Sequence, residues 1–263
     1  MIPQAYITEW RQQVPWQTSE QVEQDLVICR TLVEIFSDEW LANSLAFRGG
    51  TALHKLYLQP QPRYSEDIDL VQVRSESIKE TVQRLQAVLA FLGESSVKPR
   101  RDGIQIVFRF DSEFTPSIRL RLKVEVNTRE HFTVHGLQQF PFDVKSFWFD
   151  GSCQINTYCI EELLGTKLRA LYQRRKGRDL YDMFIALTQS PELNIDALIQ
   201  SYREYIAFSV EKPPTQREYI LNMEAKLKDK EFLGDTMGLL RPDIPYNPSE
   251  AYELVKTKLI ECI

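Results

Sequence analysis

The segment SIRLRLKVEVN, residues 117–127, alternates polar and apolar residues along its whole length. Because successive side chains of a strand point to opposite faces, one face of this segment is apolar and the other is charged. Residues 104–110 alternate in the same way. This pattern is typical of antiparallel sheet that packs one face on a core and leaves the other in solvent. The chain is therefore expected to build a sheet around these two segments.

Further strands are predicted at residues 45–48, 67–73 and 154–158. Helices are predicted where a residue that can cap a helix N-terminus precedes apolar residues at helical spacing. These capping residues are Thr18, Ser77, Asn194 and Asn247. Ser77 is followed by Glu80 at the spacing of a capping box.

The character of the sequence changes near residue 158, after which the segments are mainly helical. We therefore predict an α/β (α+β) fold with two domains. Residues 1–158 would form the first domain, with an N-terminal helix, and residues 159–263 a helical C-terminal domain.

Composition restricts the function classes. The 263 residues are 43% hydrophobic and 26% charged, which is ordinary for a globular protein. The net charge of −5 excludes a surface coated in basic residues, although a local basic patch is still compatible with nucleic-acid binding. The four cysteines form no CxxC pair, and no apolar run has the length of a signal peptide or a membrane span. We expect a cytoplasmic protein that does not engage a membrane.

Two aspartates, Asp67 and Asp69, flank Ile68 in the predicted strand 67–73 and must share one face of it. Two such carboxylates repel each other unless a cation lies between them. Mg²⁺ prefers oxygen ligands and keeps positions open for water and substrate phosphates. For a DxD pair taken alone, a solvated strand face is the simpler interpretation. Whether the pair is instead a metal site depends on the surrounding sequence.

A glycine pair, Gly49 and Gly50, precedes a helix predicted at residues 51–57. Free backbone N–H groups and the helix dipole favour an anion at such a position, and glycine allows a phosphate to approach the backbone closely. A simple tight turn would explain the glycines, but not their closeness in sequence to Asp67 and Asp69. Glycine turn and carboxylates together predict a nucleotide held between them.

The charged face of segment 117–127 supplies further candidates. Glu125 would be a third metal-site carboxylate, and Lys123 would meet a phosphate. An exposed charged face, common on antiparallel sheets, explains the same pattern equally well.

Three segments together resemble a known family: GGTAL at residues 49–53, SEDIDL at 65–70 and ELLGTKLRALYQRRKGRDLYD at 162–182. They are similar to the AbiEii/AbiGii nucleotidyltransferase toxins, which belong to the polymerase-β-like nucleotidyltransferase superfamily. The resemblance covers residues 45–190. It implies a polymerase-β-like mixed sheet with flanking helices, followed by the mainly helical domain. It also implies a toxin of a toxin–antitoxin or abortive-infection system, with a cognate antitoxin encoded nearby.

The resemblance assigns roles to individual residues. The implied metal ligands are Asp67, Asp69 and Glu125, holding Mg²⁺ or Mn²⁺. The implied nucleotide-binding residues are Gly49, Gly50, Thr51, Lys123 and Lys167. Thr51 would replace the serine hydroxyl of the superfamily, and Lys167 would meet the triphosphate as a point charge.

The last of the three segments contains a basic run. Asp179 is implied to be needed for activity and is expected to face a cleft, while Arg178 and Asp182 pair on one helical face. The acceptor would bind Arg174, Arg175 and Lys176. A second basic cluster in the first domain consists of Lys98, Arg100 and Arg101.

The sequence thus predicts transfer of NMP from an NTP to an acceptor hydroxyl, with RNA, at the 3′ end of a tRNA, as the acceptor that the resemblance implies. Two alternatives stay open. In the first, the acceptor is a protein hydroxyl; in the second, the chain is a non-catalytic nucleotide-binding module. The presence of Asp67, Asp69 and Glu125 argues against the second alternative.

Overall fold

The computed structural model describes residues 2–112 and 117–263, which form two compact units. The first unit contains the chain up to Thr133 and Leu137–Tyr158. The second contains Val134–Gly136 and Cys159–Ile263.

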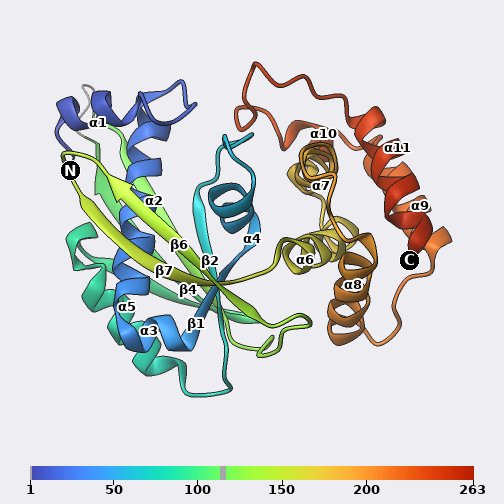
Figure 1. Ribbon diagram of the computed structural model, residues 1–263, viewed down its shortest axis with the longest axis horizontal. Coiled ribbons are helices and arrows are strands. Elements are labelled where there is room, and N and C mark those ends of the chain that lie inside the picture. Colours follow the sequence, from blue (N-terminus) through green and yellow to red (C-terminus); the bar gives the residue numbers. More distant parts are fainter. Residues whose placement is uncertain (1, 113–116) are drawn as a thin grey trace. The chain divides into compact units, whose positions relative to one another are not determined.

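Within the described residues, the first unit is built on a seven-stranded sheet with the strand order β3-β4-β5-β2-β1-β7-β6 (Figure 1). The strands are β1 (Leu45–Arg48), β2 (Asp67–Gln72), β3 (Ser95–Arg100), β4 (Gly103–Asp111), β5 (Arg119–Asn127), β6 (Leu137–Lys145) and β7 (Asp150–Tyr158). The pairs β2–β5 and β1–β7 are parallel, and the other neighbours are antiparallel. The predicted mixed sheet is therefore confirmed.

Helices lie on both faces of this sheet, with α2, α3 and α5 on one face and α4 on the other (Figure 1). The helices of the first unit are α1 (Gln4–Trp10), α2 (Ser19–Ser37), α3 (Glu39–Ser44), α4 (Gly49–Ala52), its π-helical continuation η1 (Leu53–Tyr57), α5 (Ile78–Val88) and η2 (Ala90–Leu92). The predicted cap of α2 is confirmed, since the Thr18 side chain accepts a hydrogen bond from Gln21 N. Ser77 caps α5 through Lys79 N.

The two edge strands, β3 and β6, were not predicted from the sequence. Each contains a proline, Pro99 in β3 and Pro141 in β6, and most of their residues are exposed or half-buried. Proline is tolerated at a sheet edge because one side of an edge strand makes no ladder hydrogen bonds, and it discourages pairing with another chain. The sequence signal is weak for the same reason, because an edge strand buries little apolar surface.

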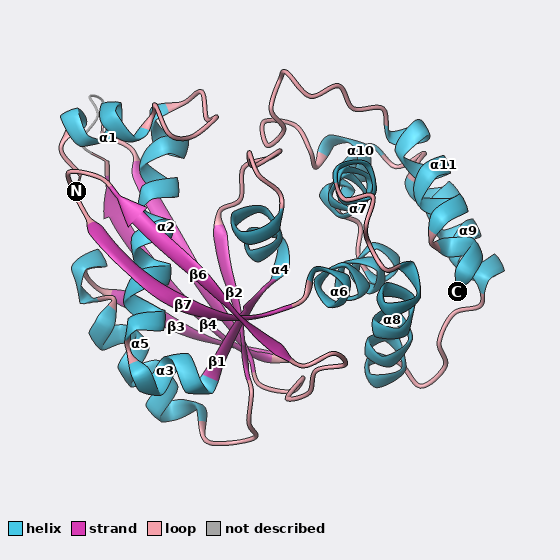
Figure 2. Cartoon of the chain, viewed as in Figure 1, coloured by secondary structure: helices cyan, strands magenta, loops and turns pink. Residues whose placement is uncertain are grey.

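The second unit is a set of helices joined by loops (Figure 2). They are α6 (Ile160–Gln173), α7 (Gly177–Gln189), α8 (Ile195–Ser209), α9 (Gln216–Lys226), α10 (Lys230–Gly234), α11 (Pro248–Lys258) and η3 (Ile260–Cys262). The predicted caps Asn194 and Asn247 are confirmed. In the described residues of both units, no helix is both long enough and apolar enough to span a bilayer.

A buried carboxylate ties the N-terminal segment to the rest of the first unit. Asp25 of α2 accepts hydrogen bonds from the indole nitrogens of Trp10 (3.0 Å) and Trp16 (2.9 Å). It also forms a 2.6 Å ion pair with Lys55, which lies on η1 directly after α4. Burial alone would lower the pKa of Lys55, but the charge of Asp25, the neighbouring Cys29 and the hydrogen bonds to both together outweigh burial and raise it. Lys55 is therefore charged in the core, and its charge depends on Asp25.

We predict that Asp25→Ala lowers the free energy of unfolding by about 3–5 kcal/mol, because Lys55 would be left buried without a counter-charge. The matched control is Asp111→Ala, which breaks the exposed ion pair with Arg119 (3.1 Å) and should cost about 0–1 kcal/mol. Urea denaturation of both variants measures the difference. Equal losses would contradict a structural role for the buried pair.

Candidate active site

The sheet register aligns the predicted site residues in one row. Arg48 of β1 lies opposite Asp69 of β2, Asp69 opposite Glu125 of β5, and Glu125 opposite Gln105 of β4. Asp67 lies opposite Lys123 in the next row on the same face. Side chains of directly opposed residues point to the same face of a sheet. The three predicted metal-site carboxylates therefore share one face of two neighbouring strands.

The backbone at Gly49 touches this row. Its φ is +80°, in the left-handed region that favours glycine. A Cβ added at Gly49 would lie 2.2 Å from Asp69 Oδ2, which is far inside van der Waals contact. Of the two glycines in the turn, Gly49 has the positive φ and Gly50 does not. The first glycine is thus needed both for the turn and for the place of the Asp69 carboxylate.

Asp67 is held from two sides. Lys123 Nζ lies 2.8 Å from Asp67 Oδ2, so the predicted phosphate ligand neutralises the predicted metal ligand. The Thr51 hydroxyl donates to the backbone carbonyl of Asp67 and lies 2.7 Å from the Ser65 hydroxyl. Because a hydroxyl has one hydrogen, Ser65 is then the donor to Thr51. Thr51 is buried and fixes the start of β2.

Glu125 is positioned by a side chain that the sequence analysis did not single out. Gln105 Nε2 donates to Glu125 Oε1, and Gln105 Oε1 accepts from Arg100 NH2 at 2.5 Å. Gln105 is buried on the site face of β4. An Arg100–Gln105–Glu125 chain therefore links edge strand β3 to the carboxylate row.

A pocket of about 310 Å³ opens beside the row. Its charged lining consists of the acidic residues Asp69, Asp102 and Glu125 and the basic residues Arg48, Arg100 and Arg101. Burial alone would lower the pKa of Arg48, but the charges of Glu130, then Tyr158 and Asp69, outweigh burial and raise it. The pocket thus brings fixed positive charge next to Asp69 and Glu125, while Asp102 is paired with Arg129, an arrangement that suits a phosphate-bearing ligand.

The donor set suits a hard divalent cation, because three carboxylates on one sheet face offer only oxygen ligands. Within the described residues, no three His, Cys, Asp or Glu side chains already gather closely enough to hold a metal ion. The Asp67 carboxylate instead meets the Lys123 ammonium. A cation at this site would compete with Lys123 for Asp67, and would take Asp69 and Glu125 as its other protein ligands.

In the second unit, Lys167 and Asp179 form a buried ion network. Lys167 Nζ lies 3.2 Å from Asp179 and 2.9 Å from Asp182. Asp179 also accepts two hydrogen bonds from Arg174, at 2.7 and 2.8 Å. The expectation that Asp179 faces a cleft was wrong, since its side chain is 0% exposed. The roles of Lys167 and Asp179 in the reaction stay predictions.

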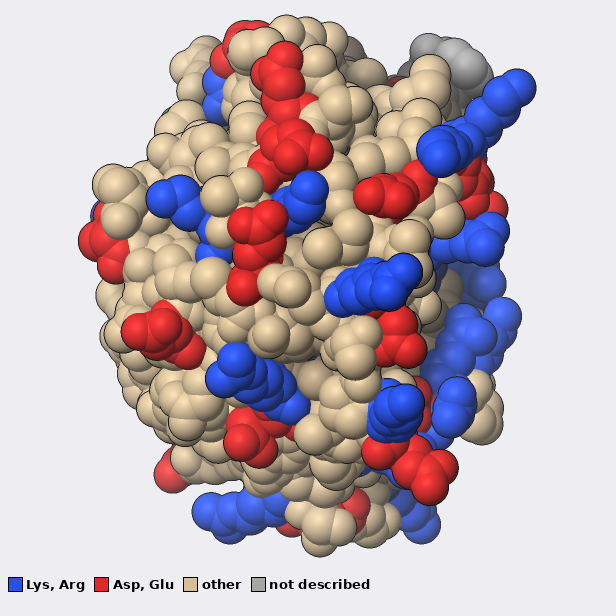
Figure 3. Space-filling model, turned by 90° about the vertical axis from the view of Figure 1, so that its right-hand side faces the viewer, with Lys and Arg blue, Asp and Glu red and all other residues tan. Residues whose placement is uncertain are grey.

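The basic run between α6 and α7 is paired with carboxylates. Arg175 pairs with Asp229 at 3.2 Å and Lys176 with Asp235 at 3.3 Å. Arg178 was expected to bind Asp182, but the structure pairs it with Asp235 at 2.8 Å. On the face drawn in Figure 3, basic and acidic side chains likewise lie beside one another. Acceptor binding by Arg174, Arg175 and Lys176 stays a prediction and would have to break these pairs.

Comparison with known proteins agrees with this geometry. A family model described as the nucleotidyl transferase AbiEii toxin of a type IV toxin–antitoxin system matches residues 30–254. No curated protein matches the chain.

Several solved structures share the fold. MenT4, a nucleotidyltransferase toxin of Mycobacterium tuberculosis, has a TM-score of 0.69 at 16% identity, covering 100% of this chain and 91% of that one. A Helicobacter pylori structure described as a nucleotidyltransferase has a TM-score of 0.60 at 19% identity and 94% and 96% coverage. JHP933 from the same species has a TM-score of 0.60 at 18% identity, with 94% of both chains covered. The predicted nucleotidyltransferase fold is thereby confirmed.

We predict that Gly49→Ala abolishes nucleotide binding, because its Cβ would displace Asp69. Gly93→Ala is the matched control: its φ is +82° and nothing lies within 4 Å of an added Cβ. Both variants should lose about 1–3 kcal/mol of stability from backbone strain. Thermal melting and nucleotide titration of each separate the two effects. If Gly49→Ala binds nucleotide as Gly93→Ala does, the close approach has no functional role.

A second prediction concerns the pH dependence of the second unit. Burial alone would raise the pKa of Asp179, but Lys167 and Arg174 outweigh it and lower the pKa below its usual value. The unfolded state therefore binds more protons, so the stabilisation is complete above about pH 4 and is lost as the pH falls through the folded-state pKa. Asp179→Asn should be less stable than the parent at pH 7, and the difference in free energy of unfolding should shrink as the pH falls below 4. A difference independent of pH would contradict the ionised network.

Proposed function

Since this chain belongs to the AbiEii family of nucleotidyl transferase toxins, we propose that it transfers NMP from an NTP to a hydroxyl of an acceptor RNA and releases pyrophosphate. The observation that carries the proposal is the row Arg48–Asp69–Glu125, closed on one side by the Gly49 backbone and open on the other to the pocket.

In this reaction the acceptor oxygen bonds to the α-phosphorus of the NTP, and the bond from that phosphorus to the oxygen bridging to the β-phosphate breaks. Pyrophosphate leaves with the bonding electrons, and the acceptor hydroxyl gives up its proton to solvent water. Mg²⁺, or Mn²⁺ in its place, would activate the attacking oxygen and stabilise the leaving one. Asp67, Asp69 and Glu125 are the residues that would hold it.

The remaining residues would act by positioning and charge. The turn at Gly49 and Gly50 would bind the triphosphate through backbone N–H groups. Lys123, once released from Asp67 by the metal, would meet a phosphate of the NTP. Thr51 would act indirectly, by fixing the start of β2. Gln105 would hold Glu125 toward the pocket, where the acceptor hydroxyl would enter.

Lys167 and Asp179 would also be required for activity. Both are buried in the ion network of the second unit, and burial supports an indirect role through the packing of α6 and α7. A direct contact between Lys167 and the triphosphate would need its ammonium to leave two carboxylates.

The biological setting follows from the family. A toxin of a type IV toxin–antitoxin system implies an antitoxin partner, and we propose a cognate antitoxin encoded nearby and action in the cytoplasm. The lack of a bilayer-spanning helix in the described residues is compatible with this setting.

The proposal is tested by incubating the purified protein with each α-labelled NTP, Mg²⁺ and either total cellular RNA or cell lysate. Label on RNA supports it, and omission of Mg²⁺ with added chelator should stop the transfer. Label on protein would replace RNA by a protein acceptor. Bound nucleotide without any transfer would identify a binding module instead.

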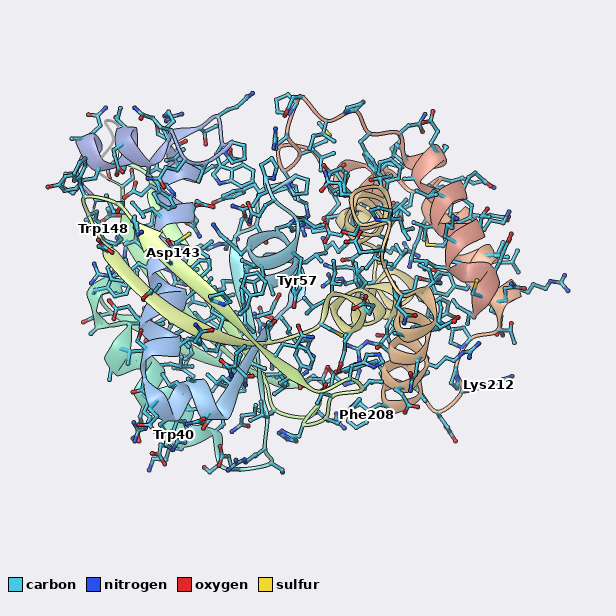
Figure 4. All side chains as sticks on the ribbon, viewed as in Figure 1. Trp40, Tyr57, Asp143, Trp148, Phe208 and Lys212 are labelled. Atoms are coloured by element: carbon cyan, nitrogen blue, oxygen red, sulfur yellow. The ribbon has the colours of Figure 1, made fainter. Side chains whose placement is uncertain are left out.

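We predict that Asp69→Asn reduces NMP transfer by at least about a hundredfold, because one neutral ligand weakens the metal site and the electrostatic stabilisation it provides. Asp143→Asn, on edge strand β6 (Figure 4), is the control with the same change in charge. Asp69 is half-buried, so both variants should melt near the parent temperature. Near-normal transfer by Asp69→Asn would remove Asp69 from the site.

A further inference from the structure

We propose that five cations of the first unit bind the phosphodiester backbone of the acceptor RNA, and that the pocket beside Glu125 seats its terminal nucleotide. This inference rests on the proposed function. The five residues, called the sheet cations, are Lys98, Arg100, Arg101, Arg109 and Arg121.

The sheet register places four of the sheet cations around the carboxylate row, and Arg101 follows β3 in the turn to β4. Lys98 lies opposite Gln105, and so extends the row Asp69–Glu125–Gln105 to the edge strand. Arg121 lies two residues before Lys123 on β5, and Arg109 lies opposite Arg121. Because directly opposed residues share a face, these cations lie on the same face as the carboxylates. Lys98 thus flanks the site across the strands, and Arg109 and Arg121 flank it along the strands.

The sheet cations are exposed and have no acidic partners among the described residues. None of the five forms an ion pair with a carboxylate of the described residues, although Arg100 contacts Gln105 and Arg109 contacts Ser96. Nearby carboxylates have other partners: Asp102 pairs with Arg129, and Asp111 with Arg119. Local charge is therefore positive on this part of an acidic protein.

Two of these cations oppose each other directly. Arg109 and Arg121 form a cross-strand pair of like charge, which destabilises a sheet. An anion bound between the two guanidinium groups would remove that repulsion. Phosphate is suited to the place, because a guanidinium group offers paired donors to its oxygens.

The pocket connects the cations to the chemistry. Arg100 and Arg101 line it together with Asp69 and Glu125, and its volume of about 310 Å³ lies at the lower end of the range for small-ligand sites. A terminal nucleotide seated there would bring its hydroxyl to the carboxylates and its phosphate to the arginines. The preceding phosphates would then continue over the exposed sheet cations.

The basic run Arg174–Arg178 is the alternative RNA-binding site, and its charges are compensated where those of the sheet cations are not. Its cations already have carboxylate partners in the second unit, so an incoming phosphate must displace Asp179, Asp229 or Asp235. The sheet cations have no such partner to lose among the described residues. For a polyanion with closely spaced charges, they are the better site.

The test compares RNA binding by three triple variants of the full chain, with bulk tRNA as the probe. Lys98→Gln/Arg100→Gln/Arg101→Gln removes three sheet cations. Arg174→Gln/Arg175→Gln/Lys176→Gln removes the basic run. The matched control, Arg74→Gln/Lys79→Gln/Lys145→Gln, removes three exposed cations elsewhere in the first unit.

The first triple should raise the Kd for tRNA about tenfold or more and reduce the slope of log K against log[salt] by about 2, because each lost phosphate contact releases fewer counterions. The control triple should change neither. Arg100→Lys/Arg101→Lys, which keeps the charge, should keep the salt slope. NTP affinity should be unchanged in Lys98→Gln, which lies outside the pocket lining, and in the control triple, which shows that the fold and the glycine turn are intact. If the first triple is unstable, Lys98→Gln and Arg101→Gln singly should each lower the slope by about 1.

Failure of this inference is distinguishable from failure of the proposed function. Suppose that the parent protein transfers NMP to RNA but the first triple variant binds tRNA with the parental affinity and salt slope. That result contradicts RNA binding by the sheet cations and leaves the proposed function intact. A loss of tRNA affinity that is confined to the Arg174 triple variant, or that is equal in the control triple variant, also contradicts RNA binding by the sheet cations. A parent that labels only protein, or transfers nothing, overturns the RNA acceptor itself.

Discussion

The site depends on one close approach, between the backbone of Gly49 and the carboxylate of Asp69. The left-handed φ of Gly49 turns the chain from β1 into α4 above the row of carboxylates. Any side chain at this residue would overlap Asp69 Oδ2. The turn that would bind phosphates and the residue that would bind metal are thus held together by the absence of a Cβ, and neither can move without the other.

Each unit also carries a buried charge that its packing depends on. In the first unit, Asp25 holds two tryptophans and Lys55, and Lys55 lies on the helical segment that follows Gly49. In the second unit, Asp179 holds Lys167 and Arg174. A buried pair need not add net stability, but removal of one partner leaves an uncompensated charge. Such pairs fix which arrangement of helices is possible, so their effect on activity can be indirect.

The sequence was informative wherever a pattern lay within one segment. Alternation predicted β4 and β5, the DxD spacing placed two carboxylates on one face, and capping residues marked α2, α8 and α11. It was uninformative where the partner is distant in sequence. The contact from Gln105 to Glu125 requires the register of β4 and β5, and the pairs of the basic run involve Asp229 and Asp235, more than fifty residues away. Local spacing instead suggested a pair between Arg178 and Asp182.

The difference between local and long-range contacts also decides which of the two groups of basic residues can bind a polyanion. Density in sequence favoured the run from Arg174 to Arg178, whereas the structure matches each of these cations with a carboxylate. Four of the sheet cations are scattered over three strands and Arg101 lies in the turn between β3 and β4, and only the register gathers those four on one face. An acidic protein attracts a polyanion through uncompensated local charge rather than through the number of basic residues. On this protein, such charge surrounds Glu125, where the proposed reaction needs its acceptor.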